Sequence, residues 1–510
     1  MLAPLIDNPR RQQIAQALAV PPPVGGWNTR DALDLMAPQD AILLDNLFPR
    51  TSDVILRKGR AVLSTTAMGS GDDVETMIPL SYGATEKMVS AAGGKIYDAS
   101  GVTPSELGTG YTDDRWQWTI FSSTIFAVNG TDAPWKYDGS TFTSSTGFTG
   151  PTLTALIDVH SHANRLYFVE KDSTSFWYGG IDAVTSTLTE FDLKTIARHG
   201  GYLNNIGTIT GDGSKDSRDQ VCFFMSTGEV IVYEGDNPGD ASAWQKVGSF
   251  KLAPPVGRHN LLEFGADLLC LTHEGLVPVA RVLPMGRSRP DREILSDKIK
   301  GAMSAALEDY KDNAGWEITH FDDGDMILVN VPITASEFHQ YVMNTNTGAW
   351  CRFKDWNGYA WTVHADKLYF GGGDGKVYQA WVGSADDGSA IEADGATAWN
   401  YFELRTQIKQ FTLARAVFLS DGAVTHTMIL NVDFDDTPPV FSVSSPAVGP
   451  VWDVAIWDAA IWFAGATTVQ AWQSASNIGY VASLRIRLST ATQQVIWNST
   501  TYQFTPGGLM

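Results

Sequence analysis

The sequence predicts an all-β protein: a degenerate β-propeller of about seven blades with a helix insertion, followed by a C-terminal β-sandwich-like domain. Three observations lead to this prediction. The chain contains 17 Trp, 16 Tyr and 23 Phe, and aromatic side chains favour strands. It also contains 48 Gly and only 18% charged residues, a composition typical of many tight turns between strands. Finally, a strand, a glycine-rich turn and a second strand recur along residues 75–383 at intervals of roughly 36 to 60 residues, the spacing of one four-stranded blade.

Residues 1–53 are expected to form an N-terminal arm and a linking segment. Apolar residues follow Asn8-Pro9 at helical spacing, which predicts a short amphipathic helix over residues 8–20. Three consecutive prolines, Pro21 to Pro23, end this arm. The arm is free to pack on its own chain or on a neighbouring one, and the sequence leaves both possibilities open.

A second short helix is predicted from Pro38 to about Asn46. Proline is favoured at the first helical position, and Asp40 would lie in the first turn, where a carboxylate interacts favourably with the helix dipole. Residues 54–395 are then predicted to form the propeller, beginning with a strand at Val54–Arg57. Because a propeller closes by pairing its first and last strands, we expect this strand to complete the last blade near residues 373–383.

Seven hairpins define the predicted blades. Each hairpin is preceded by another strand-like stretch, and together they make an antiparallel meander. The blades carry neither Trp-Asp repeats nor Asp-boxes, and six or eight blades stay open because repeats this degenerate are easily miscounted. The predicted turn centres are Gly94, Gly130, Ser173, Gly228, Gly275, Ala335 and Gly375.

One insertion, residues 283–315, interrupts the repeats. Ser296 is a predicted helix cap with Asp297 in the first turn. Four apolar residues fall on one face of the helix that follows: Ile299, Met303, Ala306 and Leu307. This pattern predicts a helix with one buried face.

Residues 396–510 form the predicted C-terminal all-β domain. Long alternating runs, such as TAWNYFELRTQIKQF and THTMILNVDF, indicate a sandwich. Within the domain, Trp452, Trp457 and Trp462 are five residues apart. This spacing fits one face of neither a strand nor a helix, so we predict a loop whose rings pack in several directions.

Charge and motif content argue against several classes of function. The formal net charge is −21, whereas a surface that binds phosphates needs clustered lysine and arginine. An acidic wall suits a conduit through which DNA slides without binding, although the same charge also keeps a large protein soluble. The chain contains no P-loop and no G-x-S-x-G motif, and its three Cys and nine His are scattered. We therefore predict no catalytic residues, no metal site, no cofactor and no membrane span.

Two motifs near the ends of the chain resemble the tail proteins of short-tailed bacteriophages. The first, from Gly25 to Arg60, reads G-G-W-N-x-R-D, then D-A-x-x-L-D-N-x-F-P and R-x-G. The second reads W-D-x-x-x-W-D-x-x-x-W from Trp452 to Trp462, and a final T-P-G-G-L follows. With the degenerate propeller and its helix insertion between them, the chain resembles the tail nozzle, or packaged-DNA stabilisation, proteins of podoviruses over most of its length.

The resemblance implies a structural virion protein and not an enzyme. Such a protein folds in the cytoplasm of the host bacterium and is then located in the virion tail. It would assemble into a homo-oligomeric ring, a hexamer, that contacts the portal, the adaptor and other tail proteins. Packaged DNA would be retained by the ring and would pass through its lumen without specific binding.

Two other functions stay open at this point. A propeller glycoside hydrolase is the enzymatic alternative, because sugar cleavage needs only two suitably spaced carboxylates. A carbohydrate-binding receptor protein of the tail is the other, with exposed tryptophans such as Trp116 and Trp177 as its binding residues.

The tail hypothesis assigns two sets of candidate residues. The predicted subunit contacts lie in the N-terminal motif and the Trp-rich region: Trp27, Arg30, Trp452, Trp457, Trp462 and Trp472. The predicted lumen-facing carboxylates lie in acidic turns, where side chains project into solvent: Asp212, Asp216, Asp322, Asp323, Asp325, Asp386 and Asp387. Ring symmetry would repeat each charge, and DNA passing within about 10 Å, one Debye length at moderate salt, would be repelled.

Overall fold

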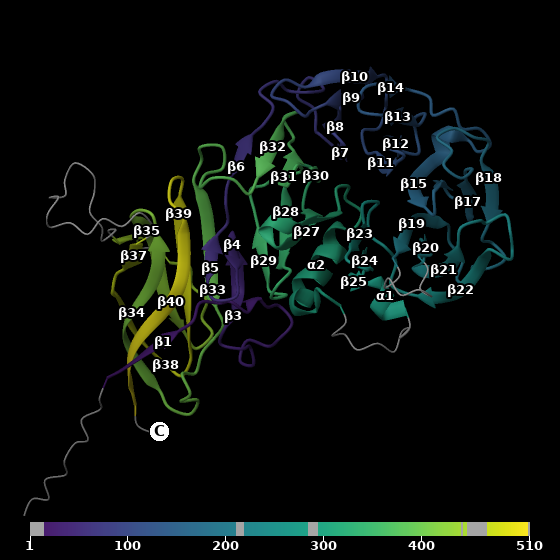
Figure 1. Ribbon diagram of the computed structural model, residues 1–510. Coiled ribbons are helices and arrows are strands. Elements are labelled where there is room, and N and C mark those ends of the chain that lie inside the picture. Colours follow the sequence, from purple (N-terminus) through teal and green to yellow (C-terminus); the bar gives the residue numbers. More distant parts are fainter. Residues whose placement is uncertain (1–14, 211–218, 284–293, 440–441, 446–466, 508–510) are drawn as a thin grey trace, which may run out of the picture. The chain divides into compact units, whose positions relative to one another are not determined.

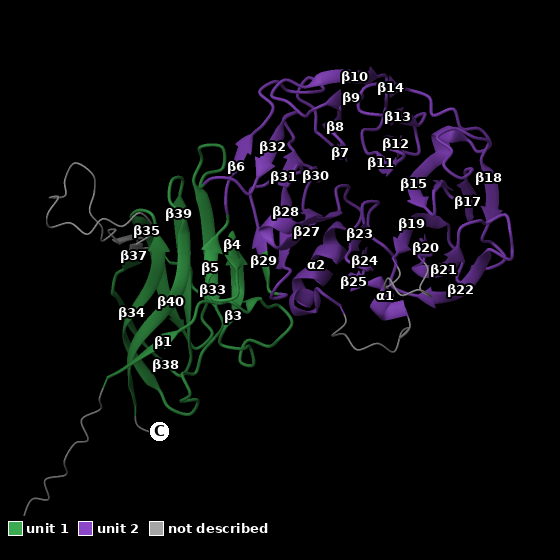
Figure 2. Ribbon diagram, viewed as in Figure 1, with its two compact units in different colours: residues 1–57, 349–351, 384–510 green, residues 58–348, 352–383 purple. Residues whose placement is uncertain are grey.

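The structure is a computed structural model that describes residues 15–210, 219–283, 294–439, 442–445 and 467–507. The chain divides into two compact units (Figure 2). Unit 1 comprises residues 1–57, 349–351 and 384–510, and unit 2 comprises residues 58–348 and 352–383. Unit 2 is therefore inserted, in sequence, between two parts of unit 1.

Unit 2 is an antiparallel β-propeller (Figure 1). Four of its sheets are meanders in which each strand pairs with the next along the chain. They are β7 (Thr76–Tyr82), β8 (Thr85–Ala92), β9 (Lys95–Asp98) and β10 (Ser105–Thr109); β11 (Gln117–Phe121), β12 (Thr124–Val128), β13 (Trp135–Tyr137) and β14 (Phe142–Thr143); β15 (Leu156–His162), β16 (Arg165–Glu170), β17 (Ser175–Tyr178) and β18 (Thr189–Asp192); and β19 (Leu203–Ile209), β20 (Gln220–Met225), β21 (Glu229–Gly235) and β22 (Trp244–Lys251).

Three more groups of strands complete the ring. One sheet has three strands, β23 (Leu261–Phe264), β24 (Asp267–Thr272) and β25 (Gly275–Pro278), and another combines β30 (Ala360–His364), β31 (Lys367–Gly371) and β32 (Val377–Ala380) with β6 (Arg60–Val62). Between them runs the meander β26 (Glu317–Phe321), β27 (Met326–Pro332), β28 (Phe338–Asn344) and β29 (Trp350–Phe353). Residues 349–351 of this meander belong to unit 1. The predicted fold class is confirmed. Six of these groups form separate sheets, whereas β26–β29 belong to a larger sheet; the sequence predicted about seven blades.

The hairpins lie where the sequence placed them. Every predicted turn centre falls between the second and third strands of a sheet, or on the first residue of the third. Gly228 shows why glycine recurs there. Its φ is +83°, and a Cβ at this position would approach the Leu252 carbonyl oxygen to 2.5 Å, so a side chain is excluded both by conformation and by space.

The propeller closes with an N-terminal strand, but not with the one that was predicted. The outermost strand of the last sheet is β6, which pairs with β32 through Tyr378 and Val62. The predicted closing strand, Val54–Arg57, instead forms β5 (Val54–Leu56), which pairs with β4 (Leu47–Pro49) and β40 (Val495–Pro506) in unit 1. Arg57 is buried within unit 1, and the strand pairing of the propeller begins only after Gly59.

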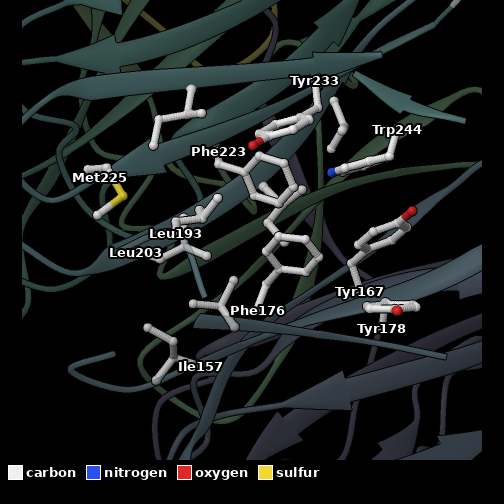
Figure 3. Close-up of a cluster of buried hydrophobic side chains, with 14 residues drawn as sticks. Ile157, Tyr167, Phe176, Tyr178, Leu193, Leu203, Phe223, Met225, Tyr233 and Trp244 are labelled. Atoms are coloured by element: carbon white, nitrogen blue, oxygen red, sulfur yellow. The ribbon is translucent and has the colours of Figure 1, made fainter. Parts of the chain in front are cut away.

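Aromatic side chains fill the space between neighbouring sheets. Between β15–β18 and β19–β22, Phe176 stacks on Phe223 with ring centroids 4.6 Å apart, and in the same cluster Tyr233 and Trp244 of the second sheet stack at 5.1 Å. Figure 3 shows these rings within one cluster of buried side chains. Each such pair adds about 0.5–1.5 kcal/mol beyond the burial of its area, so the wedges between sheets hold the ring together.

The predicted helix insertion is confirmed at its helical end. Beyond α1 (Val279–Val282), a 3₁₀ turn (Asp297–Ile299) leads into α2 (Lys300–Tyr310). The predicted apolar face is buried, with Met303, Ala306 and Leu307 at most 4% exposed. Ser296 does not cap the helix; its Oγ instead accepts the Leu276 N–H at 3.0 Å. Within the described ranges, 3₁₀ turns also occur at Leu153–Ala155 and Asp322–Gly324.

Unit 1 contains two sheets that pack face to face. One has the order β37 (Thr467–Gln470), β34 (Lys409–Ser420), β40, β5 and β4, with β38 (Gln473–Gly479) on β34 and β1 (Gln16–Val20) on β40. The other contains β2 (Gly26–Trp27), β3 (Asp40–Asp45), β33 (Ile391–Thr397), β39 (Ala482–Thr490), β35 (Val424–Val432) and β36 (Ser442–Ser445). Phe418 of β34 meets His426 of β35 at 5.1 Å between ring centroids, which places the two faces in contact. The unit includes residues 1–57 as well as the C-terminal segment.

Both helices predicted in the N-terminal segment are wrong where the structure describes them. Residues 16–20 form β1, and residues 1–14 lie outside the described part. Asp40–Asp45 forms β3, which pairs with β33, and Ala41 and Leu44 are fully buried. A proline and a carboxylate are weak local signals, and pairing within a buried sheet outweighs them.

Among the described residues, no helix is long and apolar enough to cross a membrane.

Candidate functional site

Two cavities lie at the centre of the propeller. One, of about 490 Å³, is lined by the first strand of every group in the ring, namely β7, β11, β15, β19, β23, β26 and β30. The other, of about 620 Å³, is lined by residues at the starts of β7, β11, β26 and β30 and by residues 311–316. Four residues line both cavities and therefore lie where the two meet: Gln117, Arg258, His259 and Glu317.

Strand alternation places titratable side chains at this centre. Asp158, His160 and His162 are two residues apart on β15, so they share one face of the strand. The Asp158 carboxylate accepts the Ile206 N–H of β19 at 2.9 Å. Burial raises the pKa of Asp158 to about 7, against the lowering effects of this hydrogen bond and of the Arg258 charge. Asp158 is therefore half protonated near neutral pH.

Glu317 is the second buried acid at the centre. It is the first residue of β26, and its Oε2 accepts the Trp361 N–H of β30 at 2.9 Å. Burial raises the pKa of Glu317 to about 8, so the neutral form predominates at pH 7. Both acids thus connect a strand of one sheet to a strand of the next.

Histidines repeat this arrangement. The Nε2 of His160 lies 2.8 Å from Thr208 Oγ1 on β19, and the Nδ1 of His162 lies 3.1 Å from the same oxygen. Burial lowers the pKa of both His160 and His259 to about 4. These rings are neutral at physiological pH and connect strands as uncharged hydrogen-bonding groups.

Arg258 is a cation that lines both cavities. Its Nη1 donates to the Asn129 carbonyl oxygen at 2.8 Å, and its own carbonyl accepts from Asn205 Nδ2 at 2.9 Å. Asn129 follows β12, and Asn205 lies in β19. Through its guanidinium and its backbone carbonyl, Arg258 therefore connects segments that are far apart in the sequence.

The larger cavity has a mouth of mixed charge. Arg115 donates to Glu75 at 2.5 Å, and the Tyr359 hydroxyl donates to the Ala335 carbonyl at 2.8 Å. Burial raises the pKa of Asp73 more than the Tyr359 hydrogen bond lowers it, and burial together with the Asp73 charge raises the pKa of Tyr359 to about 12. Such carboxyls and aromatic rings suit a polyhydroxylated ligand chemically, but each group named here is already engaged with its own chain.

No group of three or more His, Cys, Asp or Glu side chains with metal-binding geometry occurs in the part of the chain that the structure describes. The three cysteines, Cys222, Cys270 and Cys351, are buried and form no disulfide. Burial raises the pKa of each thiol, which keeps them protonated and unreactive.

The predicted lumen-facing carboxylates fall into three groups. Asp322, Asp323 and Asp325 are exposed on the turn between β26 and β27, and Asp387 is exposed on a separate turn. Asp386 does not project into solvent, because its side chain is 7% exposed and pairs with Arg57. Asp212 and Asp216 lie outside the described residues.

The predicted subunit contacts are similarly divided. Trp27 is 5% exposed within unit 1, so its ring offers little surface to another chain. Arg30 is exposed and pairs with Asp31 at 2.8 Å. Trp472 is 44% exposed and stacks under the Arg415 guanidinium, 4.6 Å from its ring centroid. Trp452, Trp457 and Trp462 lie outside the described residues.

The tryptophans of the receptor hypothesis are poorly exposed. Trp116 is fully buried, and Trp177 is half-buried and donates its indole N–H to Glu170 at 3.0 Å. Neither ring forms an open sugar platform.

The sequence analysis did not identify the polar residues on β15 at the propeller centre. The run Asp158-Val-His160-Ser-His162 carries polar side chains at every second position of a predicted inner strand, which is the signal that could have identified them.

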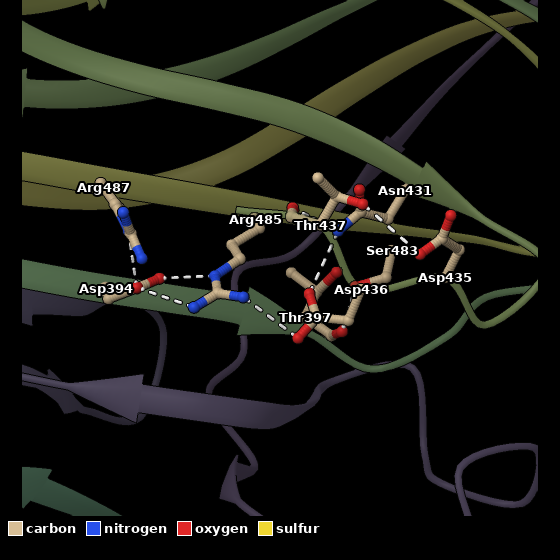
Figure 4. Close-up of polar contacts among 9 residues, drawn as sticks. All are labelled: Asp394, Thr397, Asn431, Asp435, Asp436, Thr437, Ser483, Arg485 and Arg487. Carbon is tan, nitrogen blue, oxygen red and sulfur yellow. Dashed lines mark hydrogen bonds and ion pairs between the residues drawn. The ribbon is translucent and has the colours of Figure 1, made fainter. Parts of the chain in front are cut away.

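Two ion-pair systems organise unit 1. On its surface, the Asp394 carboxylate accepts two hydrogen bonds from Arg485, both at 2.9 Å, and one from Arg487 at 2.7 Å, while Arg485 also reaches Asp436 at 3.1 Å (Figure 4). Burial alone would raise the pKa of Asp394, but the hydrogen bonds from the two arginines lower it. The network connects β33, β39 and the turn that follows β35.

The second system is buried. Arg57 donates to both oxygens of Asp386, at 2.8 and 2.5 Å, and its Nε donates to Asn46 at 2.9 Å. Arg57 and Asp386 flank the inserted propeller in the sequence. The pair therefore joins the two chain segments of unit 1 between which unit 2 is inserted.

The residues of the phage-like N-terminal motif have structural positions. Gly26 has a φ of +81°, and a Cβ there would approach the Trp350 backbone to 2.7 Å. Asn28 donates to Asp40 at 2.8 Å, and Asn46 to the Glu392 carbonyl at 2.7 Å. These contacts shape the strand connections of unit 1.

Comparisons with known proteins show no family for this chain. No protein-family model and no curated protein matches it. Among solved structures, it is similar to the extracellular domain of a hybrid two-component system from B. thetaiotaomicron, with a TM-score of 0.41, 8% identity, and coverage of 65% of this chain and 43% of that one. It is also similar to the extracellular domain of a one-component system from B. thetaiotaomicron, with a TM-score of 0.42, 10% identity, and coverage of 86% and 62%. The chain spans less than two thirds of either structure, and similarity at this level carries no argument about function.

Proposed function

We propose that this chain is a structural subunit of the tail of a short-tailed bacteriophage. In this proposal six copies form a ring below the portal and adaptor, and the packaged genome is retained above the ring and later passes through its lumen. The sequence motifs near both ends of the chain suggest this role, and the following features of the fold support it.

The observation that carries the proposal is the use of the polar groups at the centre of the propeller. Asp158, His160, Glu317 and Arg258 each hydrogen-bond to another strand or segment of the ring. A catalytic group must instead present its reactive atom to a substrate. Side chains that fasten sheets together favour a scaffold over an enzyme.

The size of the propeller centre bears on where DNA would pass. A cavity of about 490 Å³ accommodates a ligand of drug-like size, which is far smaller than a stretch of duplex DNA. In this proposal, DNA therefore passes through the space enclosed by several subunits, and not through the cavity at the centre of one propeller. Exposed carboxylates such as Asp322, Asp323 and Asp325 are suited to line it, because they repel phosphates at short range.

Genome retention by viral particles tests this function. Particles produced without this chain should package DNA and then lose it to added nuclease, and purified full-length chain added before the nuclease should restore protection. The matched control is the same preparation without added chain. Equal protection in both samples would contradict the proposal. Release of reducing sugar from host polysaccharide by the purified chain, abolished by Glu75→Gln, would favour the glycoside hydrolase instead.

A further inference from the structure

One edge of β40 is covered by β1, a short strand near the N-terminus. β40 is twelve residues long and pairs with β34 along its whole length on one side. On its other side, β5 pairs only with Ile496 and Trp497, and β1 pairs with residues 500–504. Without β1, this part of β40 would be an open edge, and open edges are where strands of other chains add to a sheet.

β1 itself contributes few buried side chains. Residues 16–19 are exposed and Val20 is half-buried, and Leu18 is 39% exposed. Within the described part of the chain, β40 is the only strand with which β1 pairs. Main-chain hydrogen bonds are therefore its principal attachment, and these bonds do not depend on which copy of the chain supplies the strand.

The connection after β1 allows the strand to change partner without disturbing unit 1. Pro22 and Pro23 are buried, and their carbonyls accept the N–H groups of Val24 and Gly26 at 2.7 and 3.0 Å. Unit 1 is thus anchored from Pro22 onward. A backbone rotation near Val20 and Pro21 would redirect β1 while every later contact stays in place, and prolines keep this short connection extended.

We propose that β1 is exchanged between neighbouring subunits, so that β1 of one copy pairs with β40 of the next in the register Ala17 to Gln503. This inference rests on the proposed ring, and it names the contact by which copies of the chain hold one another. In a closed ring each subunit would donate one strand and accept one, so that no edge of β40 is left unpaired. Pairing within one chain and exchange between subunits form the same hydrogen bonds, so exchange costs little once the subunits are neighbours in a ring.

Two variants, each with one added cysteine, test the exchange. Ala17→Cys is placed in one full-length chain and Gln503→Cys in another, since Ala17 and Gln503 are opposite each other in the paired strands and are not fully buried. The two chains are mixed under assembly conditions, oxidised mildly and digested. A disulfide-linked peptide pair containing positions 17 and 503 can arise only between chains, and we expect it to account for most of the modified protein. The native cysteines are buried and do not compete.

The matched control replaces Gln503→Cys by Gln410→Cys. Gln410 is exposed on β34, on the other side of β40 from β1, and should give little cross-linking to position 17. A doubly substituted chain, Ala17→Cys with Gln503→Cys, should form covalent multimers and little intramolecular disulfide.

The mass of the assembly, measured on the same samples, separates the two proposals. Rings in which the double variant forms only intramolecular disulfides would overturn strand exchange and leave the proposed function intact. Monomers throughout would overturn the ring and the exchange together. Removal of residues 1–20 gives a second readout, because it should convert rings to folded monomers if β1 is the contact, and should leave the rings unchanged if it is not.

Discussion

Buried titratable side chains make the propeller sensitive to pH in a definite direction. A carboxyl group in an unfolded chain titrates near pH 4, whereas Glu317 and Asp158 have pKa values raised to about 8 and about 7. The folded protein holds protons that the unfolded chain has released, so the free energy of unfolding falls as pH rises between these values. His160 and His259 act in the opposite direction, because their pKa values are lowered to about 4 and stability rises as pH rises from there to about 6.5.

Above pH 6.5 the destabilising effect of the buried acids is no longer opposed by the buried histidines, and this leads to a prediction for Glu317. Below that pH the acids and histidines oppose each other, but above it only the acids remain, and stability should fall from about pH 6.5 to 8. Replacing Glu317→Gln removes one titrating acid and keeps an oxygen acceptor for the Trp361 N–H. Relative to the native protein, the variant should gain stability as pH rises over this range, by about 1 kcal/mol per pH unit. Calorimetric unfolding at several pH values measures the difference.

The control is Glu308→Gln. Glu308 is exposed on α2, so its replacement should leave the pH dependence unchanged. A Glu317→Gln protein whose stability parallels that of the native protein between pH 6.5 and 8 would show that Glu317 is ionised in the folded state.

Arg57 provides a second test at the scale of single residues. Its guanidinium is fully buried against Asp386, and removing one partner of such a pair costs about 3–5 kcal/mol because a buried charge is left uncompensated. Arg57→Met should therefore destabilise unit 1 by this amount, as measured by chemical denaturation. The double variant Arg57→Met with Asp386→Leu should recover most of the loss, since no charge is left unpaired.

An exposed ion pair serves as the comparison. Arg50 pairs with Asp53 at 2.6 Å, but its side chain is 42% exposed, so Arg50→Met should cost less than about 1 kcal/mol. If Arg50→Met and Arg57→Met lowered the free energy of unfolding equally, burial would not explain the larger loss predicted for Arg57.

At the scale of elements, the sequence predicted correctly those features that depend on residues close together in the chain. The hairpins were found because most of their turns contain a residue, such as Gly228, that adopts a positive φ, and the residue types that favour turns can be recognised in the sequence. The face of α2 was found because Met303, Ala306 and Leu307 repeat with the helical period. Neither feature depends on contacts with distant segments.

Elements whose structure depends on pairing with distant segments were predicted wrongly. β3 was predicted as a helix because Pro38 and Asp40 imitate a helix start, yet its backbone is paired with β33, more than three hundred residues later in the sequence. The closing strand of the propeller was predicted a few residues too early for a similar reason. No local pattern distinguishes β5, which pairs in unit 1, from β6, which pairs with β32.

The candidate site was predictable only in part. Alternation placed Asp158, His160 and His162 on one face of a strand, but the sequence does not show that this face lines the centre of a ring. The acidic turn at Asp322 is exposed, as its composition predicts, whereas Asp386 is buried by Arg57, a partner more than three hundred residues away.

At the scale of the whole molecule, the net charge and the two-unit architecture suggest a part of a larger assembly. A charge of −21 discourages binding of nucleic acid, and His160, His259 and Glu317 at the propeller centre are buried and mainly neutral at pH 7. Unit 2 is inserted in a unit whose outermost strand, β1, is held mainly by its main chain. These properties suit a subunit that associates with its own copies and leaves DNA unbound.

The mass of the purified full-length protein under assembly conditions tests the central claim most directly. Each chain has a mass of 55.4 kDa, and mass photometry should show a dominant species of about six chains that appears as a closed ring in electron micrographs. A protein that stays monomeric at every concentration and salt condition examined, with no rings in the micrographs, would contradict the account.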